Sequence, residues 1–510
     1  MDIFENLING IQYIVSWQGI LAIFIGVAIG IIMGAIPGLT ATMAIAIAIP
    51  ITMTMNPIVA ISMLLGAYKG GIYGGSIPAI LIRTPGTPAA AATVIDGYML
   101  CQKGKGLKAL KMALYSSVSG DLMSIFILIM LAAPLSAIAL RFGPAETAVL
   151  IVFSLTVIGA LSTNDLIMGS ISATLGLLVA MIGLDPIMAT RRFTFDVISL
   201  DSGVELLPML IGLFAVSEVL RQVSSPAILK GVKVSAQATD PAKNRLPFRE
   251  VLTYWKTILR GTFIGAFIGI IPGIGPTVAA FLNYNESRRT SKNPEEYGQG
   301  SLEGVAAAES GNNAVAPAAL IPLLTLSIPG DIGAAVIFGA FLIHGIVPGP
   351  RIFLDHGKEV YGLFVGLILS CLVLFILGRL LIGHIYKVVN ISKRALFPVV
   401  LIMCIAGSYG INWSIFDLKT MLIFGIVGFF MEKLGLSQAT FLIAFILEPI
   451  LETSVRQALI ISKGSPIIFF ESYICWLFWA LTLFSIYTLI RRENRRRRGL
   501  KAVKRLSNKG

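Results

Sequence analysis

The chain has 510 residues, of which 56% are hydrophobic and 13% are charged, and its formal net charge is +13. Soluble domains carry about 25% charged residues, so this composition excludes a protein whose whole surface faces water. Apolar runs recur from end to end, and roughly 20 apolar residues cross a bilayer. We therefore expect an all-α polytopic membrane protein with about 10–12 spans.

The positive charge gathers between the apolar runs and in the tail after residue 490, where residues 495–498 are all arginine. A basic run after a final span is typical of the cytoplasmic side of a membrane, and we prefer this interpretation to nucleic-acid binding. The four cysteines show no disulfide framework or metal-ligand spacing. The first ten residues lack the basic region of a cleaved signal peptide, so we expect the first apolar run to be a retained span.

In chain order, the first segment, residues 19–36, is predicted to be a helix that stops at Pro37-Gly38 and resumes over residues 40–49. Residues 70–92 hold several Gly and Pro residues. They are too broken for an ordinary span and too apolar for an exposed loop, so we predict a re-entrant hairpin there. Further first-half spans are expected near residues 112–133, 145–161, 167–183 and 204–220. Second-half segments are expected near residues 261–272, 277–282, 304–326, 329–346, 361–385, 395–405, 421–431, 438–450 and 467–490.

A glycine–proline motif occurs twice, about 235 residues apart. Its members are Gly26, Gly30, Gly34, Pro37, Gly38 and Thr42, which recur as Gly261, Gly265, Gly269, Pro272, Gly273 and Thr277. A second motif recurs with an offset of 244, and it pairs Ile77-Pro78 and Pro85-Gly86 with Ile321-Pro322 and Pro329-Gly330. Helices broken at matching places in two halves are typical of secondary transporters. We divide the chain into a first membrane repeat (1–220), a basic cytoplasmic linker (221–256), a second membrane repeat (257–490) and a basic cytoplasmic tail (491–510).

Charge predicts the orientation of the halves. No Lys or Arg precedes Lys69, whereas seven basic residues between Lys230 and Arg260 precede the second copy of the motif. By the positive-inside rule, the first copy starts outside and the second starts inside. We therefore predict two inverted-topology repeats in the cell inner membrane, with the N-terminus outside and the C-terminus cytoplasmic.

Each Pro-Gly pair predicts a helix break inside the membrane. Proline removes an amide donor, and glycine tolerates unusual backbone angles. A break frees backbone groups that can hold an anion at a half-helix N-terminus or a cation at unwound carbonyls. The alternative is a structural kink, but four breaks paired across a repeat favour a site. The glycines before each proline are expected to serve close helix packing.

Hydroxyl and amide groups cluster at these breaks and suit reversible binding of a carboxylate. The predicted substrate-binding residues are Pro37, Gly38, Thr40, Thr42, Ser76, Arg83, Thr84, Pro85, Gly86, Thr87, Pro272, Gly273, Gly275, Thr277, Asn312, Asn313, Ser327, Pro329, Gly330 and Asp331. Intramembrane charges are functional candidates by default. For Arg83 a snorkelling or structural role stays open, and Glu309, beside this set, can instead cap or pair structurally.

The motifs resemble those of the large membrane subunit, or permease, of tripartite tricarboxylate transporters. The resemblance covers roughly residues 15 to 490, and its motifs are Pro37-Gly38-Leu39-Thr40, Tyr73-Gly74-Gly75-Ser76, Thr84-Pro85-Gly86-Thr87-Pro88, Asp96-Gly97-Tyr98, Pro272-Gly273-Ile274-Gly275-Pro276-Thr277, Glu309-Ser310-Gly311-Asn312-Asn313, Ile321-Pro322-Leu323-Leu324-Thr325-Leu326 and His344-Gly345-Ile346-Val347-Pro348-Gly349-Pro350. It implies symport of tricarboxylates or dicarboxylates driven by an ion gradient. It also implies two partners, a small membrane subunit and an extracytoplasmic solute-binding protein.

The chain departs from this resemblance at three residues. Arg83 stands where we expect a small amide such as Asn, and Ser327 and Asp331 flank the second Pro-Gly where Gly and a small polar residue are usual. The identity of the carboxylate therefore stays open. We expect no cofactor apart from a co-transported sodium ion or proton.

Two other classes of function remain. An intramembrane metalloprotease needs His-Glu-x-x-His, whereas the three histidines of this chain are dispersed, and no Gly-x-Ser-x-Gly elbow occurs. We therefore expect no enzyme and no bound metal. A channel or scaffold subunit of a membrane complex is the remaining alternative, and the paired breaks favour alternating access over a fixed pore.

Overall fold

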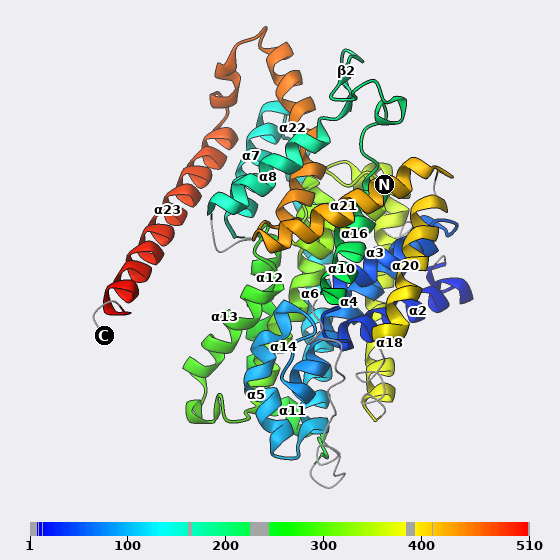
Figure 1. Cartoon of the computed structure of the whole chain (residues 1–510). Coiled ribbons are helices and arrows are strands. Elements are labelled where there is room, and N and C mark those ends of the chain that lie inside the picture. Colours follow the sequence, from blue (N-terminus) through cyan, green and yellow to red (C-terminus); the bar gives the residue numbers. More distant parts are fainter. Residues whose placement is uncertain are drawn as a thin grey trace. The chain divides into compact units, whose positions relative to one another are not determined.

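The computed structural model describes residues 8, 10–12, 14–161, 166–224, 244–383, 393–410 and 412–507. Within these ranges the chain is helical apart from loops and one antiparallel pair of two-residue strands, β1 (Gly183–Leu184) and β2 (Arg191–Arg192). Five of the described helices are long and apolar enough to cross a membrane, and six shorter helices are also apolar. The prediction of an all-α polytopic membrane protein is confirmed (Figure 1).

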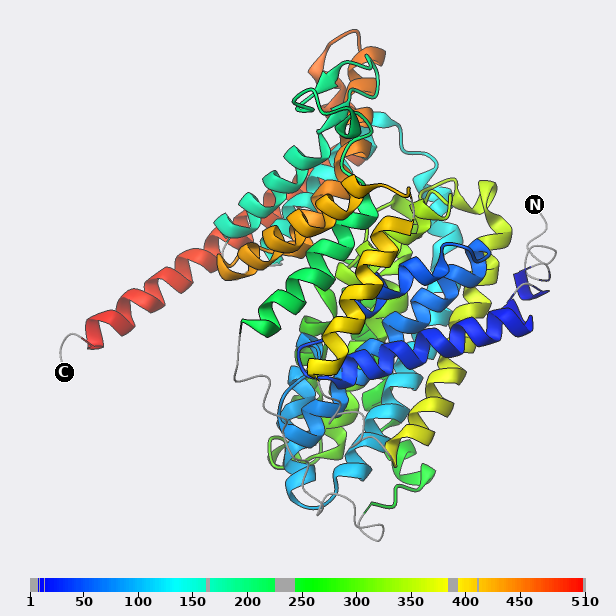
Figure 2. The ribbon, with the colours of Figure 1, turned by 45° about the vertical axis from the view of Figure 1, so that its right-hand side comes forward.

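The chain forms two compact units, residues 1–139 with 205–429 and residues 140–204 with 430–510. The helices that begin in the first unit are α2 (Trp17–Ala35), α3 (Ala41–Thr52), α4 (Pro57–Ile82), η1 (Pro88–Ala90), α5 (Ala91–Gln102), α6 (Gly106–Ala139), α9 (Leu206–Leu210), η3 (Ile211–Val216), α10 (Ser217–Val223), α11 (Phe248–Thr253), α12 (Trp255–Ile270), α13 (Gly275–Thr290), η6 (Pro294–Glu296), α14 (Leu302–Ala318), α15 (Leu320–Leu326), α16 (Ile332–Ile343), α17 (Ile352–Asp355), α18 (Gly357–Ile382), α20 (Lys393–Gly410) and α21 (Ile415–Lys433). Within this unit α3 lies beside both α4 and α20, which can be followed in Figure 2.

The second unit holds the remaining elements. They are α7 (Pro144–Leu161), α8 (Leu166–Ala180), β1, β2, η2 (Ile198–Leu200), α22 (Gln438–Ile461), η7 (Pro466–Phe470) and α23 (Tyr473–Ser507). Helix α22 packs against α7 and α8, because Gly176 lets α8 approach the backbone of Phe441 and the Ser437 amide donates to the Ser172 hydroxyl at 2.9 Å. These compact units divide the chain differently from the predicted sequence repeats, which stay a prediction. Most of the predicted linker, residues 225–243, lies outside the described residues, as do residues 1–7 and 508–510.

Close helix packing explains the glycines before each proline. Gly26, Gly30 and Gly34 of α2 lie directly against the backbone of α4, and a Cβ atom at any of them would overlap it. Of the matching glycines in the second half, Gly265 and Gly269 also lie against α14, whereas Gly261 lies against the side chains of Ser310 on α14 and Asn283 on α13. Without a hydrophobic driving force in lipid, such close approach provides much of the attraction between helices.

The segment predicted to be a re-entrant hairpin, residues 70–92, is less broken than the sequence indicated, and its re-entrant course through the membrane stays a prediction. Helix α4 continues through Gly70, Gly74 and Pro78 as far as Ile82, and the chain breaks only at residues 83–87. Both glycines face the α2 backbone, so α2 supports this stretch of helix by packing, and intrinsic propensity does not decide its conformation.

Candidate functional site

The two breaks of the first half lie against each other. Helix α2 ends before Pro37, Gly38 has a φ of 90°, and Arg83, which ends α4, has a φ of 59°. After this second break, the Gly86 amide donates to the Gly75 carbonyl at 3.0 Å. A side chain at Gly86 would overlap the carbonyl oxygen of Gly34, so glycine is required where the two breaks meet.

The second half repeats this arrangement. Gly273 has a φ of 80° and donates its amide to the carbonyl of Gly330 at 2.8 Å, while the Gly330 amide donates to the Ala319 carbonyl at 3.4 Å. Ser327 has a φ of 59°, like Arg83. Corresponding hydrogen bonds therefore recur at the predicted offset of 244, since Gly75 and Gly86 match Ala319 and Gly330.

Side chains also connect the two halves. Asp331 begins α16, where its Oδ1 accepts from the Ala334 amide at 2.8 Å, and its Oδ2 accepts from the hydroxyl of Tyr68 on α4. Gly333 lies under the Tyr68 ring, where a Cβ atom would overlap it. The second-half break is therefore held against a first-half helix.

Helices α5 and α14 run antiparallel and join the halves a second time. Gly300 lies against Leu100, Gly304 lies against Asp96, and Ala308 packs with Ala92. The two residue numbers in each pair add to 400, as expected for two antiparallel segments in a constant register. Continued along α14, this register places Asn312 level with Pro88, just after the first-half break over residues 83–87. In the part of the chain that the structure describes, both polar atoms of the Asn312 side chain and Oγ1 of Thr87 are buried without a hydrogen-bond partner.

A buried carboxylate lies one helical turn before Asn312. Glu309 accepts hydrogen bonds from the Thr93 hydroxyl, from the Ser117 hydroxyl at 3.0 Å and from the Asn313 amide at 3.2 Å. These three donors are neutral, and Glu309 is fully buried. Thr93 and Ser117 were missed from the sequence, because single hydroxyls in apolar runs carry no signal of their own.

A buried ion pair was also missed. The Lys69 ammonium lies 2.8 Å from Asp121, and both side chains are at most 2% exposed. Lys69 also donates to the Leu367 carbonyl and the Ser370 hydroxyl, both at 2.8 Å, and the Cys371 thiol donates to Asp121 at 3.0 Å. Buried charges persist when they are paired and hydrogen-bonded in this way.

Several predicted site residues have local structural partners. Thr40 begins α3, accepts from the Met43 amide at 3.2 Å and contacts the Thr42 hydroxyl at 2.8 Å. Ser76 donates to the Tyr73 carbonyl and Ser327 donates to the Pro348 carbonyl.

The remaining predicted residues lie at or beside the breaks. Arg83 and Thr84 are exposed, and the Arg83 guanidinium lies 5.8 Å from the centre of the Tyr98 ring. Pro37, Pro85, Pro272, Gly275 and Thr277 are half-buried, whereas Pro329 is buried. The assignment of the whole set to substrate stays a prediction.

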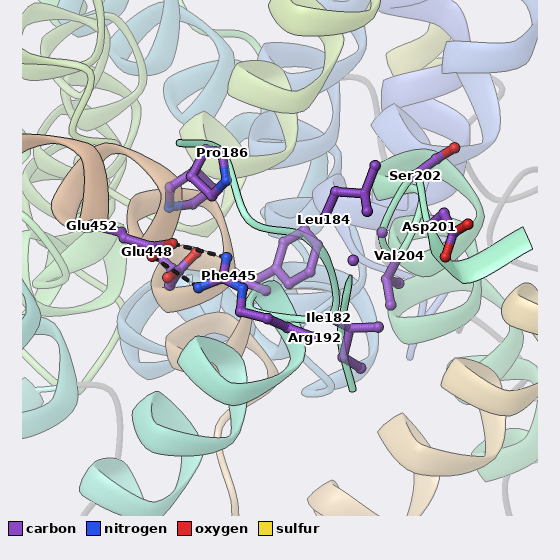
Figure 3. A pocket seen from close by; sticks show the side chains of 14 residues that line it. Ile182, Leu184, Pro186, Arg192, Asp201, Ser202, Val204, Phe445, Glu448 and Glu452 are labelled. Atoms are coloured by element: carbon purple, nitrogen blue, oxygen red, sulfur yellow. Dashed lines mark hydrogen bonds and ion pairs between the residues drawn. The ribbon is translucent and has the colours of Figure 1, made fainter. Parts of the chain in front are cut away.

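The second unit contains a cavity of ≈ 260 Å³ that the sequence did not predict (Figure 3). Arg192 lines it and donates to both carboxylate oxygens of Glu452, at 2.8 and 3.1 Å. Beside it, Arg456 pairs with Asp185 at 2.8 Å. Hydrogen bonds from the Met188 and Ile187 amides and from Arg456 lower the pKa of Asp185 to about 2. These ionised groups are paired with one another, so the cluster fixes the loop over residues 181–205 to the end of α22.

Broken helices that meet in pairs, with buried polar groups at the breaks, are typical of polytopic membrane proteins of the transporter class. The chain matches the tripartite tricarboxylate transporter TctA family over residues 20–443 and belongs to it. A relative from Agrobacterium vitis, described as an uncharacterized 52.8 kDa protein in the TAR-I ttuC' 3' region, is 34% identical over 479 residues, which is 92% of each chain. A second protein of that organism, from the TAR-II ttuC' 3' region, is 40% identical over 205 residues, 40% of this chain and 85% of its own. No solved structure matches.

Proposed function

We propose that this protein is the large permease subunit of a binding-protein-dependent tripartite transporter and takes up small carboxylates, either tricarboxylates or dicarboxylates, driven by an ion gradient. Membership of the TctA family supports transport. The main support for a substrate site comes from Asn312 and Thr87, near the first-half break over residues 83–87. Their polar side-chain atoms are buried and have no hydrogen-bond partner among the described residues. Buried polar groups are normally hydrogen-bonded, so a bound substrate explains these two side chains.

The breaks suit an anion that must also be released. Each half-helix carries roughly half an elementary charge at its end, which offsets part of a carboxylate's charge without a fixed cation. The one arginine in the predicted set, Arg83, is exposed, so a bidentate arginine clamp is not part of this proposal. Weak neutral donors allow substrate to leave when the site opens to the other side.

A co-transported sodium ion or proton supplies the coupling in this proposal. Glu309 is the residue best placed for it, since its partners are neutral and Asn313, beside Asn312, donates to it. A proton or sodium ion at Glu309 would change the hydrogen bonding of Asn313. Because Glu309 lies one helical turn before Asn312, this change in hydrogen bonding would occur next to the proposed substrate position.

The accessory subunits follow from the family and are proposed here. A small membrane subunit and an extracytoplasmic solute-binding protein would deliver substrate from outside. The basic C-terminal part of α23, from residue 491 onward, supports a cytoplasmic C-terminus. This orientation would put the start of α23, and with it the loop over residues 181–205, on the outer side of the membrane.

Uptake of labelled citrate and succinate into proteoliposomes tests this proposal. We expect accumulation only with an inward sodium or proton gradient, and faster accumulation when the binding protein is supplied. Equilibration without accumulation under every gradient would instead support the channel, and absence of flux with all subunits present would support the scaffold.

A further inference from the structure

Tyr68 and Asp331 have counterparts in the opposite halves. The offset of 244 that relates Pro78 to Pro322 and Gly86 to Gly330 also relates Tyr68 to Asn312 and Thr87 to Asp331. The pair Tyr68 with Asp331 therefore corresponds to the pair Asn312 with Thr87. Tyr68, on α4 of the first half, bonds to Asp331 at a second-half break. For the other pair, helix α14, which carries Asn312, contacts η1, which follows Thr87 at the first-half break over residues 83–87.

At the second-half position, the protein supplies its own carboxylate. Asp331 lies at the N-terminus of α16, with one oxygen on the Ala334 amide and the other on the Tyr68 hydroxyl. This carboxylate is 4% exposed. An anion at a helix N-terminus is stabilised both by the free amides and by the helix dipole.

The corresponding first-half position, Thr87, carries no carboxylate. Thr87 begins η1, which continues directly into α5, and its side chain makes no capping hydrogen bond. Thr87 is 7% exposed and Asn312 is fully buried, and their polar side-chain atoms have no partner among the described residues. Helix α14, which carries Asn312, contacts both η1 and α5.

We propose that one carboxylate of the substrate binds at the first-half break, between the Asn312 amide and the Thr87 hydroxyl, at the N-terminus of the helix formed by η1 and α5. Asp331 shows how a carboxylate sits at such a position, since it occupies the corresponding place in the second half. This inference rests on the proposed function. The inference also implies that the break over residues 83–87 and the break before Asp331 differ in substrate binding. The negative charge of Asp331 repels a second substrate carboxylate from the second-half break.

The most direct test introduces the residues of the second-half pair, Asp331 and Tyr68, at the corresponding positions 87 and 312. The double variant Thr87→Asp/Asn312→Tyr places an internal carboxylate and its tyrosine donor at the proposed position. We expect binding of labelled citrate and succinate to the purified full chain to fall by about tenfold or more. Thermal unfolding in detergent and elution as a single species would show that the variant folds.

If the double variant does not fold, single variants at positions 87 and 312 test the same binding site. Thr87→Val and Asn312→Leu should each weaken citrate or succinate binding by about tenfold, while Thr87→Ser retains the hydroxyl and should bind within about twofold of the parent. Thr262→Val is the matched control, because Thr262 is equally buried but its hydroxyl donates within α12 to the Ile258 carbonyl.

The outcomes separate the two proposals. Parent binding that survives both Thr87→Val and Asn312→Leu would overturn the inference but leave carboxylate transport intact. A parent chain that binds neither citrate nor succinate would overturn the proposed function and this inference with it.

Discussion

The buried ion pair of Lys69 and Asp121 shows that the sequence reveals charged residues in apolar segments but does not reveal their partners. Their charges within apolar segments are visible in the sequence, and such charges are functional candidates by default, but we selected neither residue from the sequence. Their pairing at 2.8 Å is not visible, because α4 and α6 carry no spacing rule that brings positions 69 and 121 together. The same holds for Thr93 and Ser117, which become recognisable only through their contacts with Glu309.

Neutralising one partner of this ion pair should destabilise the protein. In Lys69→Met, Asp121 keeps its charge without the lysine, and an uncompensated buried charge costs about 3–5 kcal/mol. We expect a lower thermal unfolding temperature for Lys69→Met in detergent. The double variant Lys69→Met/Asp121→Asn removes both charges and should recover most of the loss. Equal loss in the single and double variants would show that the pairing is not what stabilises this region.

At the scale of elements, the sequence predicted where helices break better than where they continue. The break at Pro37-Gly38 was predicted, because proline and a glycine with positive φ leave the chain little alternative. The continuation of α4 through Gly70, Gly74 and Pro78 was not predicted. The α2 backbone supports Gly70 and Gly74 from the side, and such tertiary support has no signature in local propensity.

The contact between the first-half breaks should tolerate no side chain at Gly86. A Cβ atom there overlaps the Gly34 carbonyl and approaches Gly75, so Gly86→Val should abolish carboxylate uptake. Gly410→Ala is the matched control, since a Cβ atom at Gly410 meets nothing within 4 Å. Uptake by both variants and their amount in the membrane would be measured. Parental uptake by Gly86→Val would show that the breaks need not meet.

At the scale of the whole molecule, the sequence predicted an all-α polytopic membrane protein, because this class depends on composition and on the spacing of apolar residues. The grouping of residues 140–204 with residues 430–510 into one compact unit was not predicted. It depends on contacts such as Arg192 with Glu452, which are 260 positions apart. The inverted orientation of the repeats stays a prediction from charge.

Accessibility of introduced cysteines tests that orientation. Val15 precedes α2 and is 50% exposed, and Phe248 precedes α12 and is 67% exposed. In inverted repeats, Val15→Cys should react with a membrane-impermeant maleimide from outside the cell, and Phe248→Cys only after permeabilisation. The parent chain is the control, because its four cysteines are buried. Labelling of both positions from the same side would contradict the inversion.

The most direct test of the central claim is gradient-driven uptake of labelled citrate and succinate by proteoliposomes that contain either the parent chain or Asn312→Ala. Asn312 lies on α14, which contacts η1 beside the break over residues 83–87, and both polar atoms of its side chain are buried without a partner among the described residues. Its loss therefore removes a proposed substrate contact and leaves no broken protein hydrogen bond. We expect accumulation by the parent chain under a sodium or proton gradient, and none by Asn312→Ala, which should insert and fold like the parent. Equal uptake by the two proteins, or uptake by the parent that ignores every ion gradient, would contradict it.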